Sequence, residues 1–171
     1  YVVSDRGSEF LQLGYFELPT QTLTALTDDI AWNVEAVALA PNGQQLAFII
    51  NENGASKLYL METATGQKQP LSALPAGMMR GLEWRKNGEE LGFTLMSARS
   101  TADIFSLNVA TGEVQRWTQS ETAGLNPETF SEPELVEWQS FDGRTITGFL
   151  YRPPAQFTGP RPVAMYIHGG P

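Results

Sequence analysis

Short apolar stretches separated by turn residues fill most of the chain. Segments 46–50 and 91–95 are apolar or alternating runs of strand length, and each follows an Asn-Gly pair, at 42–43 and 87–88. Because Asn-Gly tolerates the positive φ angles of a two-residue type I′ hairpin, each pair is expected to join two antiparallel strands. Helix signals are nearly absent, and only 127–130 is compatible with a single helical turn.

This pattern occurs twice, at a spacing of about 45 residues. In each copy a second strand-like segment follows, 57–60 or 103–107, and then a Thr-Gly pair, at 65–66 or 111–112. A period of that length filled with short strands is typical of the four-stranded blade of a β-propeller. We therefore predict a mainly β fold that contains part of a propeller. The alternative is an ordinary β-sandwich whose hairpins resemble each other by coincidence.

An incomplete copy precedes these two. Segment 10–26 predicts the last two strands of a blade, because 15–18 has the side-chain pattern that 58–61 and 104–107 have in the later copies. Residues 1–130 are therefore expected to form a partial propeller of about two and a half blades. Such a partial array leaves sheet faces and edges uncovered, so we expect an isolated chain of this span to self-associate.

The pattern changes after the repeat. Residues 132–134, Glu-Pro-Glu, predict a linker, and strands are predicted for 135–140 and 145–151, on either side of an Asp-Gly turn. Beyond a proline-rich loop, 163–167 is a continuous apolar run, as expected of a strand covered on both faces of a parallel or mixed sheet. We assign residues 131–171 to the first strands of a second, truncated domain.

Composition limits the class of partner. The chain is 42% hydrophobic, enough to build a core, and its 19 acidic against 11 basic residues give a net charge of -8. That charge repels phosphate backbones and anionic lipid surfaces, so neither nucleic acid nor a membrane is expected as a partner. With no cysteine and one histidine, we expect no metal site and no cofactor. Absence of cysteine favours a cytoplasmic location, although a periplasmic protein without disulfides has the same composition.

The tetrapeptide His168-Gly169-Gly170-Pro171 follows the predicted apolar strand. In an α/β-hydrolase, the loop after the third strand supplies one backbone N–H of the oxyanion hole through an HGGG-type sequence. Pro171 has no N–H, so the donor is Gly169 or Gly170, and we favour Gly170. Such a donor typically contributes about 2.7–4 kcal/mol to stabilisation of the transition state.

Two stretches carry a resemblance to a known family. Segment 140–153 resembles the Ser-x-Asp-Gly-x-x-Ile-x-Gly-x-Leu-x-x-Pro entry into the catalytic domain of prolyl oligopeptidase family serine peptidases. The tetrapeptide 168–171 resembles the oxyanion loop of the acylaminoacyl-peptidase and dipeptidyl-peptidase-like branch. The turn sequences Pro-Asn-Gly at 41–43 and Thr-Gly at 65–66 resemble those of propellers in this family and of TolB-like propellers. The resemblance covers the chain in order, propeller first and α/β-hydrolase second.

The resemblance implies a peptidase that cleaves short peptides with a Ser-Asp-His triad, while the propeller gates access. It implies that Gly170 donates to the oxyanion. We interpret His168, a lone histidine at a strand end, and Pro171 as residues that orient the loop. No Gly-x-Ser-x-Gly occurs in the chain, and in α/β-hydrolases the triad follows the oxyanion loop. We therefore expect no catalytic residue here, the triad beyond Pro171, and no activity from this fragment alone.

Two other interpretations stay open. One is a TolB-like propeller that acts as a protein-binding module, and the other is an esterase of the α/β-hydrolase fold with an unrelated β-rich amino-terminal region. Glu89 and Glu90 could suggest a site for a peptide amino terminus. They follow an Asn-Gly turn, however, and neighbouring strand residues point to opposite faces, so we interpret them as solvated turn residues.

Overall fold

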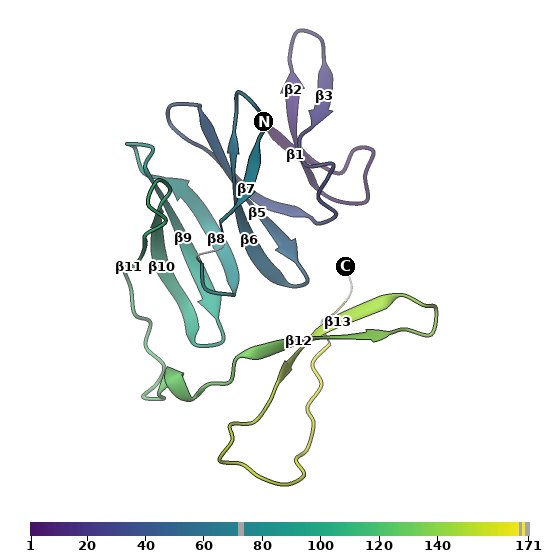
Figure 1. The fold of residues 1–171 in the computed structure, drawn as a ribbon, viewed down its shortest axis with the longest axis vertical. Helices are drawn as coiled ribbons and strands as arrows, with labels where there is room; N and C mark the ends of the chain where they lie inside the picture. Colours follow the sequence, from purple (N-terminus) through teal and green to yellow (C-terminus); the bar gives the residue numbers. More distant parts are fainter. Residues whose placement is uncertain (72–73, 168, 170–171) are drawn as a thin grey trace.

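The structure is a computed structural model that describes residues 1–71, 74–167 and 169. Two four-stranded sheets form its centre (Figure 1). In each, the strands follow in chain order and are antiparallel to their neighbours, as in a propeller blade. The first complete blade comprises β4 (Val34–Leu39), β5 (Gln45–Glu52), β6 (Ala55–Glu62) and β7 (Lys68–Pro70). The second complete blade comprises β8 (Met78–Trp84), β9 (Glu90–Ser97), β10 (Ser100–Asn108) and β11 (Val114–Arg116).

A three-stranded sheet precedes these blades and forms a partial blade. Its strands are β1 (Val2–Ser4), β2 (Gln12–Glu17) and β3 (Thr22–Ala25), again antiparallel and in chain order. The two strands expected between residues 10 and 26 are confirmed, and β1 adds a third that is too short to produce a periodic signal. The predicted mainly β fold with four-stranded blades is therefore confirmed.

Strand β5 holds the blades together, because both of its faces are buried. Leu46, Phe48 and Ile50 pack toward the partial blade, in a cluster with Leu13. The alternate residues Ala47 and Ile49 pack toward the second complete blade.

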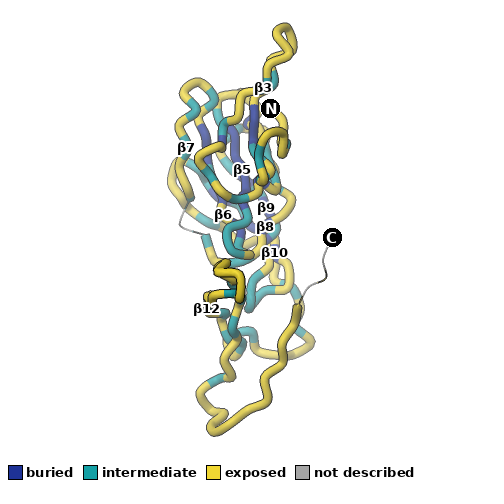
Figure 2. Tube along the Cα trace, turned by 90° about the vertical axis from the view of Figure 1, so that its right-hand side faces the viewer, coloured by how far each residue is buried: buried dark blue, intermediate teal, exposed yellow. Residues whose placement is uncertain are grey.

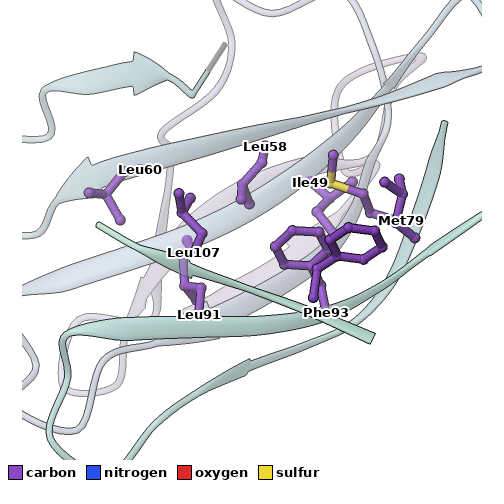
Figure 3. Close-up of a cluster of buried hydrophobic side chains, with 10 residues drawn as sticks. Ile49, Leu58, Leu60, Met79, Leu91, Phe93 and Leu107 are labelled. Atoms are coloured by element: carbon purple, nitrogen blue, oxygen red, sulfur yellow. The ribbon is translucent and has the colours of Figure 1, made fainter. Parts of the chain in front are cut away.

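Figure 3 shows the second of these clusters, in which leucines of both complete blades pack beside Phe93. The ring of Phe93 stacks on that of Phe105. The innermost strands β4 and β8 lie side by side. The indole Nε1 of Trp84 in β8 donates to the carbonyl of Ala38 in β4 over 2.9 Å, which adds a polar link between the two blades.

The turns differ in type from the prediction. At 42–43, 87–88 and 142–143 only the glycine has positive φ, and its N–H donates to the carbonyl three residues earlier. Each is a type I turn that ends in the glycine, in a four-residue loop at 41–44 and 86–89 and in a three-residue loop at 141–143. The type I′ geometry occurs instead at Asn53 and Gly54, with φ of 53° and 83°, where Glu52 pairs directly with Ala55 and leaves a two-residue loop.

The last part of the chain forms one hairpin. After a 3-10 turn at Pro127–Thr129, where a single turn was predicted, β12 (Pro133–Gln139) pairs in antiparallel fashion with β13 (Thr145–Tyr151). Both predicted strands are confirmed, but β12 begins at Pro133, so the predicted linker at 132–134 is wrong for most of its length. We call β12 and β13 the C-terminal hairpin.

The strand predicted for 163–167 is absent from the structure. These residues have no regular structure and are exposed, with Tyr166 94% accessible (Figure 2). A strand of this composition needs hydrogen-bonding neighbours and apolar cover on both faces. Within the described residues β12 and β13 pair with each other and supply neither, so the prediction is wrong for the chain as it stands.

The burial of β5 makes a direct prediction. Replacing Phe48, which is fully buried and stacks on Tyr59, by alanine should destabilise the chain by about 3–5 kcal/mol because it leaves a cavity between blades. Ile104→Ala serves as the control, since Ile104 lies half exposed on β10. Urea unfolding followed by tryptophan fluorescence measures both variants. Equal losses would contradict the blade interface described here.

Candidate functional site

The predicted oxyanion loop is only partly visible. His168, Gly170 and Pro171 lie outside the described residues, so their predicted roles stay predictions. Gly169 is described and is exposed at the end of the segment without regular structure. A side chain at Gly169 would meet no described atom within 4 Å.

In the C-terminal hairpin, which precedes this loop in the chain, an indole ring lies close to a glycine. Val136 pairs with Gly148, and Trp138 pairs with Ile146. The Trp138 ring leans over Gly148, so that a Cβ there would lie 3.2 Å from the Trp138 Cη2 atom. The glycine of the Ile-x-Gly motif therefore makes room for an indole.

A few contacts join this hairpin and the segment before it to the blades. A Cβ on Gly54, in the turn between β5 and β6, would lie 2.9 Å from Cε2 of Phe149, so the Phe149 ring sits directly on this turn. Arg99, in the turn between β9 and β10, pairs with Glu128 at 3.2 Å and with Glu132 at 2.9 Å. The hairpin and the segment before it thus rest on the turns at one end of both complete blades.

Glu89 and Glu90 do not form a shared site. Glu89 accepts a hydrogen bond from the Asn87 side chain at 2.8 Å, and Glu90 pairs with Arg85 at 2.9 Å. The interpretation as an exposed turn residue is confirmed for Glu89, whereas Glu90 is the first residue of β9 and is partly buried.

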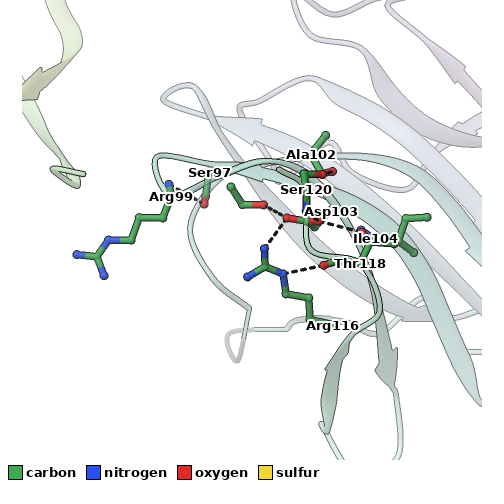
Figure 4. A network of polar contacts seen from close by, with 9 residues as sticks. Ser97, Arg99, Ala102, Asp103, Ile104, Arg116, Thr118 and Ser120 are labelled. Atoms are coloured by element: carbon green, nitrogen blue, oxygen red, sulfur yellow. Dashed lines mark hydrogen bonds and ion pairs between the residues drawn. The ribbon is translucent and has the colours of Figure 1, made fainter. Parts of the chain in front are cut away.

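Among the described residues, Asp103 has the most strongly shifted pKa, and the sequence pattern did not indicate it. Its carboxylate is fully buried in β10, between turns and strands of the second complete blade (Figure 4). Arg116 Nη2 lies 2.6 Å from Oδ2, and Oδ1 accepts from the Thr118 hydroxyl at 2.9 Å and from the Ser120 N–H at 2.7 Å. The Ser100 hydroxyl also donates to Oδ2.

Burial alone would raise the pKa of the Asp103 carboxyl. Hydrogen bonds from Ser100, Thr118, the Ser120 N–H and Arg116 outweigh it and hold the pKa well below its ordinary value. The charge is thus matched on all sides by donors of the same blade. These hydrogen bonds hold the segment after β11 against β10. Each carboxylate oxygen already accepts from two donors, so the group is not available to bind a substrate.

Two further site classes find no support among the described residues. Nowhere in this part of the chain do three or more His, Cys, Asp or Glu side chains converge as a metal site would require. Nor does any helix there have the length and apolar character needed to cross a membrane.

Comparison with known proteins identifies the fold. No family model matches the chain. A puromycin-hydrolysing peptidase of Mycobacterium tuberculosis matches 90% of it with a TM-score of 0.74 at 18% identity. A prolyl endopeptidase structure matches 87% with a TM-score of 0.69 at 18% identity. TolB from Acinetobacter baumannii matches 85% with a TM-score of 0.55 at 21% identity.

These matches establish a fold shared with both peptidases over most of the chain. The chain spans about a quarter of the length of the peptidases, 24% and 22%, and 33% of TolB. The resemblance to prolyl oligopeptidase relatives that the motifs indicated is therefore confirmed at the level of the fold.

The Asp103 network predicts a pH-dependent stability. Because the folded-state pKa is lowered, the carboxylate contributes fully above the ordinary pKa of about 3.9, and the contribution is lost as the pH falls toward the folded-state value. Asp103→Asn should cost about 2–4 kcal/mol at pH 7 and progressively less below pH 4. Urea unfolding across this pH range measures the difference.

Asp142→Asn is the matched control, because Asp142 pairs with Arg144 on an exposed turn at 3.3 Å. The Asp142→Asn substitution should lower the free energy of unfolding by less than about 1 kcal/mol. A cost for Asp103→Asn that is small at pH 7, or that grows as the pH falls, would refute the role assigned to the network.

Proposed function

We propose that the chain is part of a serine peptidase of the prolyl oligopeptidase family that hydrolyses short peptides. One observation carries the proposal: the fold of two peptidases follows this chain through the blades and over 87–90% of its length. Segment 140–153, which carries the family's entry motif, forms the turn and second strand of a hairpin directly after the last blade. The order of blades and hairpin is the order that the motif predicts.

In this proposal the C-terminal hairpin begins the α/β-hydrolase domain. Residues 163–167 become its next strand once further strands of a longer protein pair with them and cover both faces. That pairing would account for an apolar segment that is exposed in the chain by itself.

The reaction is acyl transfer to a serine that lies beyond Pro171, with Asp and His following it in the chain. The N–H of Gly170, or else of Gly169, donates to the oxyanion, while His168 and Pro171 orient the loop. The propeller limits which peptides reach the serine. In this proposal residues 1–171 supply the oxyanion loop and part of the propeller, and the nucleophile comes from residues beyond Pro171.

A second candidate function is a TolB-like propeller that binds another protein. The match to TolB supports it, although its TM-score of 0.55 is lower than those of the peptidases. The C-terminal hairpin distinguishes the two candidates. Its motif resembles the entry into a catalytic domain, which a peptidase needs and a propeller that only binds another protein does not. No observation in the structure favours an esterase.

Hydrolysis tests the proposal directly. The full-length protein that contains this span should release chromophore from an aminoacyl p-nitroanilide and should cleave short peptides, whereas the purified chain 1–171 should do neither, because it lacks a nucleophile. Turnover of p-nitrophenyl esters without peptides would indicate an esterase. Peptide turnover by chain 1–171, free of contaminating protease, or none by the full-length protein would contradict the proposal.

A further inference from the structure

The chain contains three identical Asn-Gly dipeptides, at 42–43, 53–54 and 87–88, and all of them lie in turns between strands. Asparagine is a thermolabile residue. In this dipeptide the backbone nitrogen of glycine can attack the side-chain amide of asparagine, because glycine has no Cβ to hinder the approach. Since the reacting residues are the same at each position, the contacts of each turn decide which asparagine reacts first.

Two of these asparagines are held at both reacting groups. The side-chain Oδ1 of Asn42 accepts from the Gln44 N–H at 2.9 Å, and that of Asn87 accepts from the Glu89 N–H at 3.1 Å. In both turns the glycine N–H donates to the backbone carbonyl three residues earlier, at 2.8 Å. Attack by the glycine nitrogen therefore requires the loss of two hydrogen bonds, one of which joins backbone to backbone.

The third asparagine, Asn53, is held less firmly. Within the described part of the chain its side chain makes no hydrogen bond. The N–H of Gly54 donates to a side chain, the Oδ1 of Asn51, at 2.9 Å. Rotation of the Asn51 side chain therefore frees the attacking nitrogen without breaking a backbone hydrogen bond.

Water access gives the opposite order of reactivity. Asn42 and Asn87 are exposed, whereas Asn53 is half-buried. If exposure decided the rate, the first two would react first. Hydrogen bonding predicts that Asn53 reacts first, so the order of reaction distinguishes the two causes.

We propose that Asn53 is a site of spontaneous deamidation, restrained by the hydrogen bond from Gly54 to Asn51. The Gly54 nitrogen attacks Cγ of Asn53, and a new C–N bond closes a succinimide ring. The side-chain nitrogen leaves as ammonia and takes the proton that the Gly54 nitrogen loses. Water then opens the ring at either carbonyl, which gives aspartate or isoaspartate, so water is the co-reactant.

The consequence reaches the C-terminal hairpin. A Cβ on Gly54 would lie 2.9 Å from Cε2 of Phe149, so the Phe149 ring sits on the reacting turn. Glu52 pairs directly with Ala55 across the same two-residue loop. Isoaspartate lengthens the main chain of this loop by one methylene, which the tight turn does not accommodate. Deamidation should therefore weaken the contact between the first complete blade and the hairpin.

Timed incubation of the full-length protein in mildly alkaline buffer, followed by peptide mapping with tandem mass spectrometry, tests the proposal. In the folded protein Asn53 should convert roughly tenfold faster than Asn42 or Asn87, the factor expected for one additional hydrogen bond at those sites. In concentrated urea all three should convert at similar rates, because the turns are lost. Fastest conversion at Asn42 or Asn87 in the folded protein, or equal rates at the three sites, would overturn the proposal.

The variant Asn51→Ala tests the restraint. It removes the acceptor of the Gly54 N–H and should accelerate conversion of Asn53 roughly threefold or more, as loss of a weak hydrogen bond does. Asn42 and Asn87 are internal controls in the same sample, and their rates should not change. An unchanged rate at Asn53 would contradict the restraint assigned to Asn51.

Hydrogen exchange tests the consequence for the hairpin. After incubation, amides of 145–151 should exchange faster than in fresh protein, because the turn under Phe149 has changed. The matched control is Asn53→Gln, which removes the reactive asparagine and should show no such change on incubation. Equal acceleration in both proteins would show that the change in the hairpin does not come from Asn53.

Discussion

The whole structure depends on one constraint: the first complete blade is a sheet with two apolar faces, and both faces must be covered. Strand β5 meets this constraint completely, because Phe48 and Ile49 point to opposite sides and both are fully buried. A continuous apolar run is stable in an antiparallel sheet only between two neighbours. The partial blade and the second complete blade are those neighbours, and stacking follows from the sequence of β5.

The same constraint explains what the ends of the stack look like. Among the described residues, the second complete blade is covered on one side only, and its other side carries Thr94 and Ser106 beside the partly exposed Met96 and Ile104. Asp103 lies in the same strand as Ser106, yet its carboxylate is enclosed by donors of its own blade. The blade therefore holds its edge by local polar contacts.

Much of the fold was predictable because it is local. The repeat, the positions of the glycine turns and the limits of β13 follow from alternation and from positive-φ glycine. The type of each turn was not predictable from the dipeptide, because Asn-Gly occurs both at 53–54 and at 42–43, in loops of different length. Asp103 was invisible since its partners Arg116 and Thr118 meet it only after folding. The apolar run at 163–167 forms a strand only with neighbouring strands and apolar side chains against both faces, and the run itself does not determine whether these are present.

Labelling of the full-length protein with a fluorophosphonate probe, followed by peptide mapping, tests the central claim most directly. Such probes react with the activated serine of a serine hydrolase. The account predicts one labelled serine, located after Pro171 in a Gly-x-Ser-x-Gly sequence. A labelled serine within residues 1–171, or no activated serine at all, would contradict the proposal that this chain is part of a serine peptidase whose nucleophile lies downstream.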